Sequence, residues 1–136
     1  HDPSVCERCG VVFHDGIFEW MKEVPANAEK FLCPACRRIE DNYEGGIVYL
    51  EGEFLQKHKD EILNLIKNVE EQEMEYRPLE RIIDIKEENG KLVIRTTYEH
   101  LARRIGEAVH KAYKGDLKLN YPEGKKYVRV YWHRES

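Results

Sequence analysis

The chain has 136 residues and a net charge of -4; 35% of the residues are charged and 41% belong to the hydrophobic class. This length suits one domain or two small ones, and the composition is that of a well-solvated protein with a modest core. No apolar run approaches the roughly 18 residues that a membrane span requires, so we expect no membrane partner.

The charge is divided unevenly along the chain. Residues 1–39 carry five Lys/Arg and six Asp/Glu, residues 40–90 carry six and fifteen, and residues 91–134 carry eleven and four. The last segment therefore has a balance of +7, which favours a polyanionic partner for that part of the chain.

Four cysteines form two C-x2-C pairs, Cys6 with Cys9 and Cys33 with Cys36, and the chain has no others. Each pair places two thiolates on one side of a tight turn. The two pairs together therefore predict one tetrahedral site, with four sulfurs each about 2.3 Å from a zinc ion. Two disulfides or four buried thiols are the alternatives. Disulfides need an oxidising compartment, and no apolar signal segment stands before Cys6, so we expect a metal site and a cytoplasmic location.

The segments around the cysteines predict a zinc ribbon. Residues 11–18 form a hairpin that turns through Asp15-Gly16, and residues 21–31 form a loop. His14 follows Cys9 closely, but with four thiolates available we interpret it as a turn residue. A unit this small buries little apolar surface, so the metal is expected to supply much of its folding free energy.

Beyond Cys36 we predict a helical turn over 37–43 and a strand over 47–50, which we assign with the cysteines to one unit, residues 1–52. Arg37 and Arg38 stand next to the metal ligands in sequence. Two interpretations stay open for them. They contact phosphate, or they offset the negative charge of a metal bound by four thiolates.

Residues 53–77 are predicted to form a long connecting helix. From residue 53 to about residue 75 the apolar residues repeat with helical spacing, and Pro78 then disfavours helix at Arg77, so we expect a hinge there. The apolar stripe is expected to be core, although a partner helix could also use it. It consists of Leu55, Ile62, Leu65, Ile66 and Val69.

Residues 78–136 are predicted to form a basic ββαββ module. Asn89-Gly90 is the strongest hairpin signal in the chain, and Thr97 is a plausible N-cap for the helix. The predicted strands are 82–86, 92–96, 117–121 and 127–133, and the predicted helix is 98–113.

The last strand combines aromatic rings with positive charge. Alternation directs Val128, Val130 and Trp132 to one face, and Tyr127, Arg129, Tyr131 and His133 to the other. Tyrosine rings stack on bases and arginines neutralise phosphates, although both residue types are also common on strand surfaces. The candidate RNA-contacting residues are Arg37, Arg38, Arg103, Arg104, Lys111, Lys114, Lys125, Lys126, Tyr127, Arg129, Tyr131 and Arg134.

Motifs for catalysis are absent from the sequence. We find no P-loop, no dinucleotide-binding glycine fingerprint, no nucleophile elbow and no His-Glu-x-x-His helix. The many carboxylates lie in charged runs without the apolar setting that would separate their pKa values. The chain is therefore predicted not to be an enzyme.

Four stretches, residues 33–39, 52–55, 58–71 and 100–108, resemble a family of small, stand-alone prokaryotic four-cysteine zinc-ribbon proteins over nearly the whole chain. That family is in turn distantly similar to the N-terminal zinc region of the nuclear export adapter of the large ribosomal subunit. The resemblance implies a ribosome-associated role, and it assigns only the four cysteines as zinc ligands. It carries over no RNA-contacting residue, and the adapter's export tail has no counterpart here.

The two cysteine knuckles are also similar to those of rubredoxin, which hold a single iron for electron transfer. Rubredoxin favours a glycine after the second knuckle, where this chain has Arg37. That departure favours zinc, although four thiolates accept either metal.

Together these observations predict an α+β protein with a zinc ribbon, a connecting helix and a basic C-terminal module. The expected function is RNA binding on a ribosome or a ribosomal precursor. A protein-interaction adaptor that uses the ribbon and the acidic helix, and a rubredoxin-like iron redox protein, are the alternatives.

Overall fold

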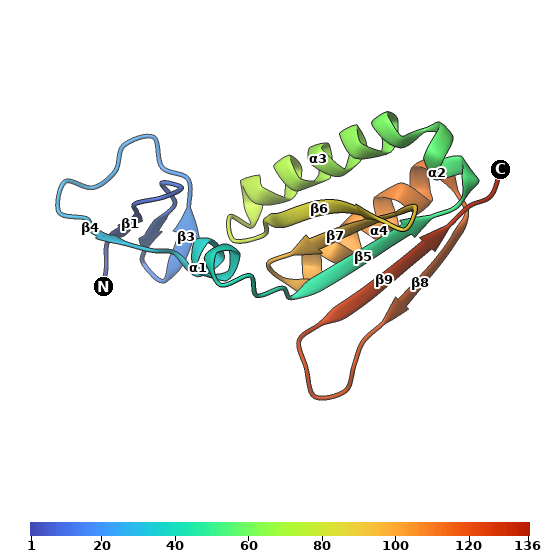
Figure 1. Cartoon of the computed structure of the whole chain (residues 1–136). Coiled ribbons are helices and arrows are strands. Elements are labelled where there is room, and N and C mark those ends of the chain that lie inside the picture. Colours follow the sequence, from blue (N-terminus) through green and yellow to red (C-terminus); the bar gives the residue numbers. More distant parts are fainter.

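The computed structural model describes residues 1–136 and is an α+β structure with two mixed sheets and four helices. We call residues 1–44 the N-terminal unit and residues 45–136 the sheet unit; Figure 1 shows them side by side along the molecule. No helix combines the length and the apolar character that crossing a membrane would require.

The N-terminal unit is a small four-stranded sheet followed by one helix. Its strands lie in the order β3-β2-β1-β4, with β1 and β4 parallel and the other pairs antiparallel. Strands β1 and β4 were not predicted, because three-residue strands carry almost no periodic signal. The elements are β1 (Ser4–Cys6), β2 (Val12–His14), β3 (Ile17–Glu19), β4 (Glu29–Phe31) and α1 (Pro34–Glu40).

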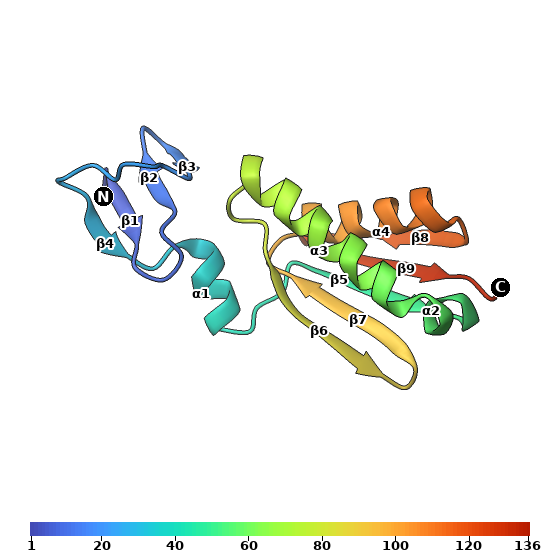
Figure 2. The same ribbon diagram turned by 90° about the horizontal axis from the view of Figure 1, so that it is seen from above.

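The sheet unit is a five-stranded sheet with helices on one face (Figure 2). Its strand order is β6-β7-β5-β9-β8, in which β5 and β9 are parallel and the other neighbours are antiparallel. The elements are β5 (Gly46–Glu51), α2 (Glu53–Lys57), α3 (Lys59–Tyr76), β6 (Ile82–Glu88), β7 (Lys91–Thr96), α4 (Glu99–Tyr113), β8 (Asp116–Asn120) and β9 (Val128–His133).

Both predicted hairpin turns are confirmed. Asp15 and Gly16 join β2 to β3 with φ angles of 52° and 78°, and Asn89 and Gly90 join β6 to β7 with 52° and 80°. Two successive positive φ angles are the mark of a type I′ turn, whose twist matches that of the flanking strands.

The main core lies between the sheet and the two long helices. Apolar side chains of β5 and β9 face α3 and α4, and Trp132 is the largest of them at 1% exposure. Glycine at position 106 lets α4 approach closely, because a Cβ there would overlap Cγ1 of Val130. The predicted apolar stripe of α3 is core: Ile62, Ile66 and Val69 are buried.

Two predicted boundaries are wrong. Strand β5 was assigned to the N-terminal unit, residues 1–52, but it pairs with β7 and β9 at the centre of the larger sheet. The segment 53–77 is not a connecting helix. It breaks at His58 into α2 and α3, and α3 packs beside α4 on the sheet. The predicted order ββαββ is found within residues 78–136, but β5, α2 and α3 belong to the same unit, whose full order is β-α-ββ-α-ββ with α2 and α3 as its first helical crossover.

The start of α4 also differs from the prediction. Thr97 does not cap the helix; its hydroxyl accepts from the Arg81 amide at 2.9 Å and donates to the Leu79 carbonyl at 2.7 Å. A carboxylate from the preceding loop acts at the helix start instead, because the Leu101 amide donates to Glu80 Oε1 at 2.9 Å. Tertiary contacts thus replace the local cap.

Candidate metal centre and candidate nucleic-acid interface

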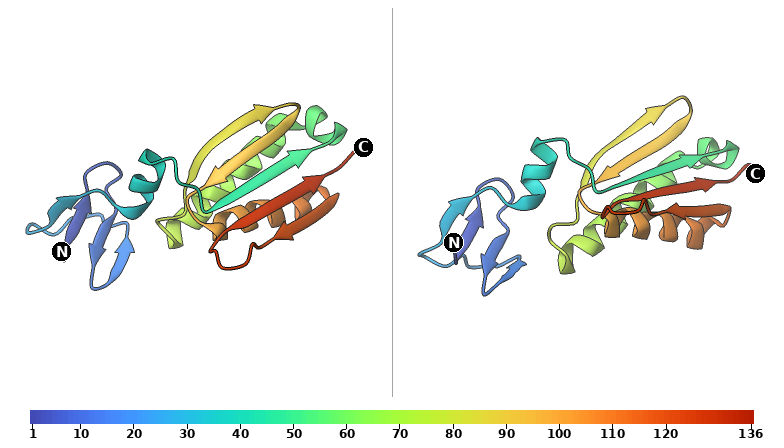
Figure 3. Two further views of the ribbon diagram at one scale, coloured as in Figure 1. Left: turned by 60° about the horizontal axis from the view of Figure 1, so that its bottom comes forward. Right: turned by 90° about the horizontal axis from the view of Figure 1, so that it is seen from below.

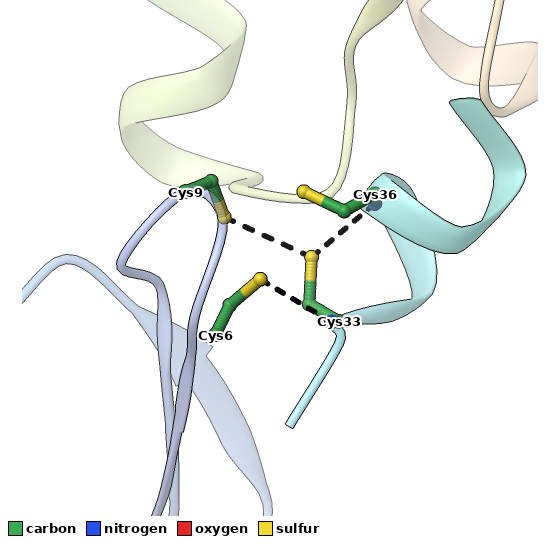
Figure 4. Close-up of side chains that lie close together, drawn as sticks. All are labelled: Cys6, Cys9, Cys33 and Cys36. Carbon is green, nitrogen blue, oxygen red and sulfur yellow. Dashed lines mark hydrogen bonds between the residues drawn. The ribbon is translucent and has the colours of Figure 1, made fainter. Parts of the chain in front are cut away.

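The four cysteines meet where the first turn of the chain faces the start of α1. Cys6 ends β1 and Cys9 lies in the turn that follows, while Cys33 is the N-cap of α1 and Cys36 lies in its first turn. Figure 4 shows the four sulfurs pointing toward a common centre. All four are free thiols, so the disulfide alternative is wrong.

The sulfur geometry fits one metal ion. All four Sγ atoms lie within 4.8 Å of one another, and Cys9 Sγ is 3.8 Å from Cys33 Sγ. Metal–sulfur bonds of about 2.3 Å in a tetrahedron place the sulfurs about 3.8 Å apart. His14 is outside this cluster and contacts Asp2 instead, as expected of a turn residue.

Backbone amides and burial affect the thiols in opposite directions. Burial acts to raise the pKa of the Cys6 thiol, but the amides of Cys33, Cys9 and Arg8 outweigh it and lower that pKa to about 6. For Cys36, burial and then the neighbouring Cys33 sulfur raise the pKa to about 12. Four thiolates are therefore poorly tolerated together without a cation at their centre.

One arginine of the sheet unit reaches the sulfur cluster. Arg81 is 7% exposed, and its Nη2 donates to Cys9 Sγ at 3.2 Å while Nη1 lies 3.9 Å from Cys36 Sγ. Its Nε donates to the Pro78 carbonyl at 2.7 Å, and the guanidinium lies 5.4 Å from the ring centroid of Trp20. A buried positive charge thus lies against the negative sulfurs and joins the two units.

The role considered for Arg37 and Arg38 in balancing the metal charge is not supported by their positions. Arg37 is exposed on α1, and the guanidinium of Arg38 contacts the sheet unit instead of the sulfurs. Arg38 donates to the Thr97 carbonyl at 2.7 Å and lies 4.0 Å from the ring centroid of Tyr98. Arg38 therefore holds α1 against the sheet unit, and Arg81 supplies the charge beside the sulfurs.

One face of the larger sheet has no covering helix. Helices α3 and α4 lie together on the opposite face, and Figure 3 (left) shows the bare face in front of them. We call this surface the open face. Its middle row, read from β6 to β8, is Lys86, Val93, Tyr49, Tyr131 and Lys118. The rings of Tyr49 and Tyr131 stack with centroids 5.3 Å apart and planes 12° apart.

The charge of the open face changes along its strands. The row nearest the N-terminal unit has two arginines against one carboxylate, and the far row has three carboxylates against one lysine. The near row is Asp84, Arg95, Ile47, Arg129 and Asn120. The far row is Glu88, Lys91, Glu51, His133 and Asp116. Positive charge therefore gathers at the end near the N-terminal unit.

Only some of these cations are available to a ligand. Arg95 is held by Asp84 at 2.5 Å and by Glu44 at 3.3 Å, and Lys91 pairs with Glu51 at 3.1 Å. Arg129 donates only to the Asn120 side chain, at 3.4 Å. Lys118 has no carboxylate within 4.0 Å and is exposed.

A groove of about 560 Å³ continues the open face toward the N-terminal unit. The β8–β9 loop forms one side with Lys125 and Lys126, and Arg38 and Tyr43 form the other. Neither lysine has a carboxylate partner. Tyr127 also lines the groove and donates to Glu44, and burial followed by this carboxylate raises the pKa of the Tyr127 hydroxyl above its usual range.

The predicted RNA-contacting residues do not form one surface. Tyr127, Arg129 and Tyr131 lie on the open face beside Lys125 and Lys126. The basic residues of α4 lie on the covered side of the sheet, where Arg103 and Arg104 pair with Glu107, and Arg104 also pairs with Glu73. Lys111 and Lys114 are exposed near the end of that helix, and Arg134 stacks on Phe54.

Four residues at these sites were not predicted. Tyr49, Lys118 and Asn120 join the open face only because β5 and β8 flank β9, and that pairing has no local sequence signal. Arg81 resembles any arginine before a strand.

Comparison with known proteins gives no relative, because no family model, no curated protein and no solved structure matches the chain. The resemblances drawn from the sequence therefore stay predictions.

Proposed function

We propose that this chain is a zinc-containing RNA-binding protein that acts on a ribosome or a ribosomal precursor, with the open face and the adjoining groove as the RNA site. The observation that carries the proposal is the open face itself, where a stacked tyrosine pair lies beside Arg129 and Lys118, two cations that have no carboxylate partner. Aromatic rings and unpaired cations on a sheet surface are what RNA-binding sheets use.

In this proposal the metal has a structural role. Four protein ligands fill a tetrahedral zinc site and leave no position for a substrate, which is the pattern of structural zinc sites. Zinc bound there would hold the first turn and α1 together, and Arg81 would balance its charge. The N-terminal unit would then present the Arg38 side of the groove to the RNA.

The carboxylates of the far row restrict where RNA can bind on the open face. Glu51, Glu88 and Asp116 would repel phosphates, so the RNA backbone is expected on the near half of the open face and along the groove.

Salt titration of RNA binding tests the proposal. Binding of a labelled RNA of about ten nucleotides should weaken steeply as salt rises, by a slope of about 0.7 per contacted phosphate. Replacing Lys125 and Lys126 by alanine should reduce that slope by about 1.4. The matched control replaces Lys111 of α4 and Lys114, the residue that follows this helix, by alanine, which removes the same charge from outside the site. Equal losses in both double variants would mean that net charge, and not this site, drives binding.

Cosedimentation with ribosomal subunits at low and high salt tests the ribosomal part of the proposal separately.

Metal analysis of the purified protein should give one zinc per chain, and a visible absorption band from iron bound by thiolates would contradict zinc.

A further inference from the structure

A recess opens on the open face between Tyr131 and strand β8. It has a volume of about 560 Å³ and is lined by Lys118, Asn120, Arg129 and Tyr131. The recess is open to solvent and lined by only four residues, so it can receive one face and one edge of a planar group but does not enclose a ligand. Because two strands form its floor, the recess is fixed by the sheet.

The ring of Tyr131 forms the aromatic wall of this recess. Tyr131 is 41% exposed, and Tyr49 stacks against it from β5 without lining the recess. Tyr49 therefore supports the ring on one side while the side toward β8 stays accessible. A planar, unpaired base fits against such a supported ring, and stacking there needs no particular base.

The other lining residues supply polar groups of the kinds that bind a nucleotide. Arg129 and Asn120 lie on neighbouring strands and touch at 3.4 Å, and the Arg129 guanidinium is 5.3 Å from the ring centroid of Tyr127. Together they present several N–H donors and one amide acceptor to the edge of a base. Lys118 adds an unpaired ammonium for a phosphate.

We propose that this recess holds one unpaired base of single-stranded RNA, stacked on Tyr131 with its edge toward Arg129 and Asn120 and a neighbouring phosphate at Lys118. This inference rests on the proposed RNA-binding function and names its substrate class. In a duplex both faces of each base are covered by its neighbours, so a tyrosine ring reaches only an unstacked base. From the recess, the RNA strand continues past Arg129 to Lys125 and Lys126, because the carboxylates of the far row repel its phosphates.

The test compares a single-stranded RNA of about ten nucleotides with a duplex of the same sequence, using the full chain loaded with zinc. Replacing Tyr131 by leucine removes the ring and should weaken single-strand binding about 5- to 150-fold, while Tyr131→Phe keeps the ring and should stay within about twofold. Tyr76→Leu is the matched control, because Tyr76 is 83% exposed at the end of α3. A 2-aminopurine base in the RNA should lose fluorescence on binding to the native chain and not to the leucine variant.

The outcomes separate this inference from the proposed function. If Tyr131→Leu binds single strands normally while the Lys125 and Lys126 variant does not, RNA binding stands and the stacking recess is wrong. Equal or tighter binding of the duplex also overturns the inference. If no RNA binds the native chain, both proposals fail. Unchanged thermal unfolding of Tyr131→Phe and Tyr131→Leu confirms that the comparison concerns binding and not folding.

Discussion

At the scale of single residues, Arg81 connects the chemistry of the sulfurs to the packing of the two units. Its guanidinium contacts two cysteine sulfurs, a backbone carbonyl and the face of Trp20. Groups that hydrogen-bond to metal ligands tune the affinity of the site. Lysine carries the same charge but cannot make this planar set of contacts at once.

We expect Arg81→Gln to weaken zinc binding about 10- to 100-fold, since the ligand sulfurs lose their charge-balancing donor. Competition with a chromophoric chelator measures the affinity. The zinc affinity of Arg81→Lys should lie between that of the native chain and that of the glutamine variant. Arg37→Gln is the control, because Arg37 is exposed on α1. Native affinity in Arg81→Gln would show that the contact is only packing.

Local signals explain which residues of the sites were predictable. The cysteine spacing and the Asp-Gly and Asn-Gly turns are decided within a few residues, and they are found as expected. Arg81 acts through Cys9, which is remote in sequence, so nothing near it indicates a role. Tyr127, Arg129 and Tyr131 were found because alternation in one strand is itself local.

At the scale of secondary-structure elements, the contact of α4 with β9 decides how closely helix and sheet pack. Gly106 faces Val130, and a Cβ at position 106 would also lie 3.2 Å from Cδ1 of Leu117. Helix propensity alone favours alanine over glycine by about 1 kcal/mol. Overpacking a tight contact costs about 1 to 3 kcal/mol. The two effects have opposite signs, so the measured sign identifies the stronger one.

We expect Gly106→Ala to lower the free energy of unfolding by about 1 to 2 kcal/mol, because the overlap with Val130 outweighs the propensity gain. Urea denaturation measures the change. The double variant Gly106→Ala/Val130→Ala should lose less free energy of unfolding than the sum of the two single variants, since the methyl added at position 106 enters the space that the valine leaves. A stabilised Gly106→Ala chain would mean that α4 shifts freely over the sheet.

The elements also show where sequence patterns stop being informative. The helical spacing of apolar residues in α3 was predicted correctly. The same spacing is expected of a helix that connects two units and of a helix that packs on a sheet, so it did not show that α3 packs on the sheet. A strand was likewise predicted over 47–50, and it lies within β5 (Gly46–Glu51). Its partners come from β7 and β9, which follow much later in the chain, so its place in the larger sheet needed the tertiary structure.

At the scale of the whole molecule, two cores of different size stabilise the two units. The sheet unit has a cluster of fifteen buried residues, whereas the buried cluster of five in the N-terminal unit includes three of the cysteines. Removal of the metal is therefore expected to unfold the N-terminal unit and to leave the sheet unit folded.

The fluorescence of the two tryptophans reports separately on the unfolding of the two units, because Trp20 lies in the N-terminal unit and Trp132 is buried in the sheet core. Chelation should change the emission of Trp20 and leave that of Trp132 unaltered. The variant Trp20→Phe should then show no chelator response in its fluorescence. A response from Trp132 in that variant would mean that both units unfold as one.

Strand β9 lies between β5 and β8 and runs parallel to β5, although it is the last strand along the chain. During folding, β5 can pair with β7 early, but its other edge stays unpaired until β9 arrives, and β8 has no neighbour without β9. Such remote pairing slows folding and leaves a strand edge exposed to other chains in the meantime. The strand that carries Arg129 and Tyr131 thus also closes the sheet, so the proposed RNA site requires β9 to be paired on both edges.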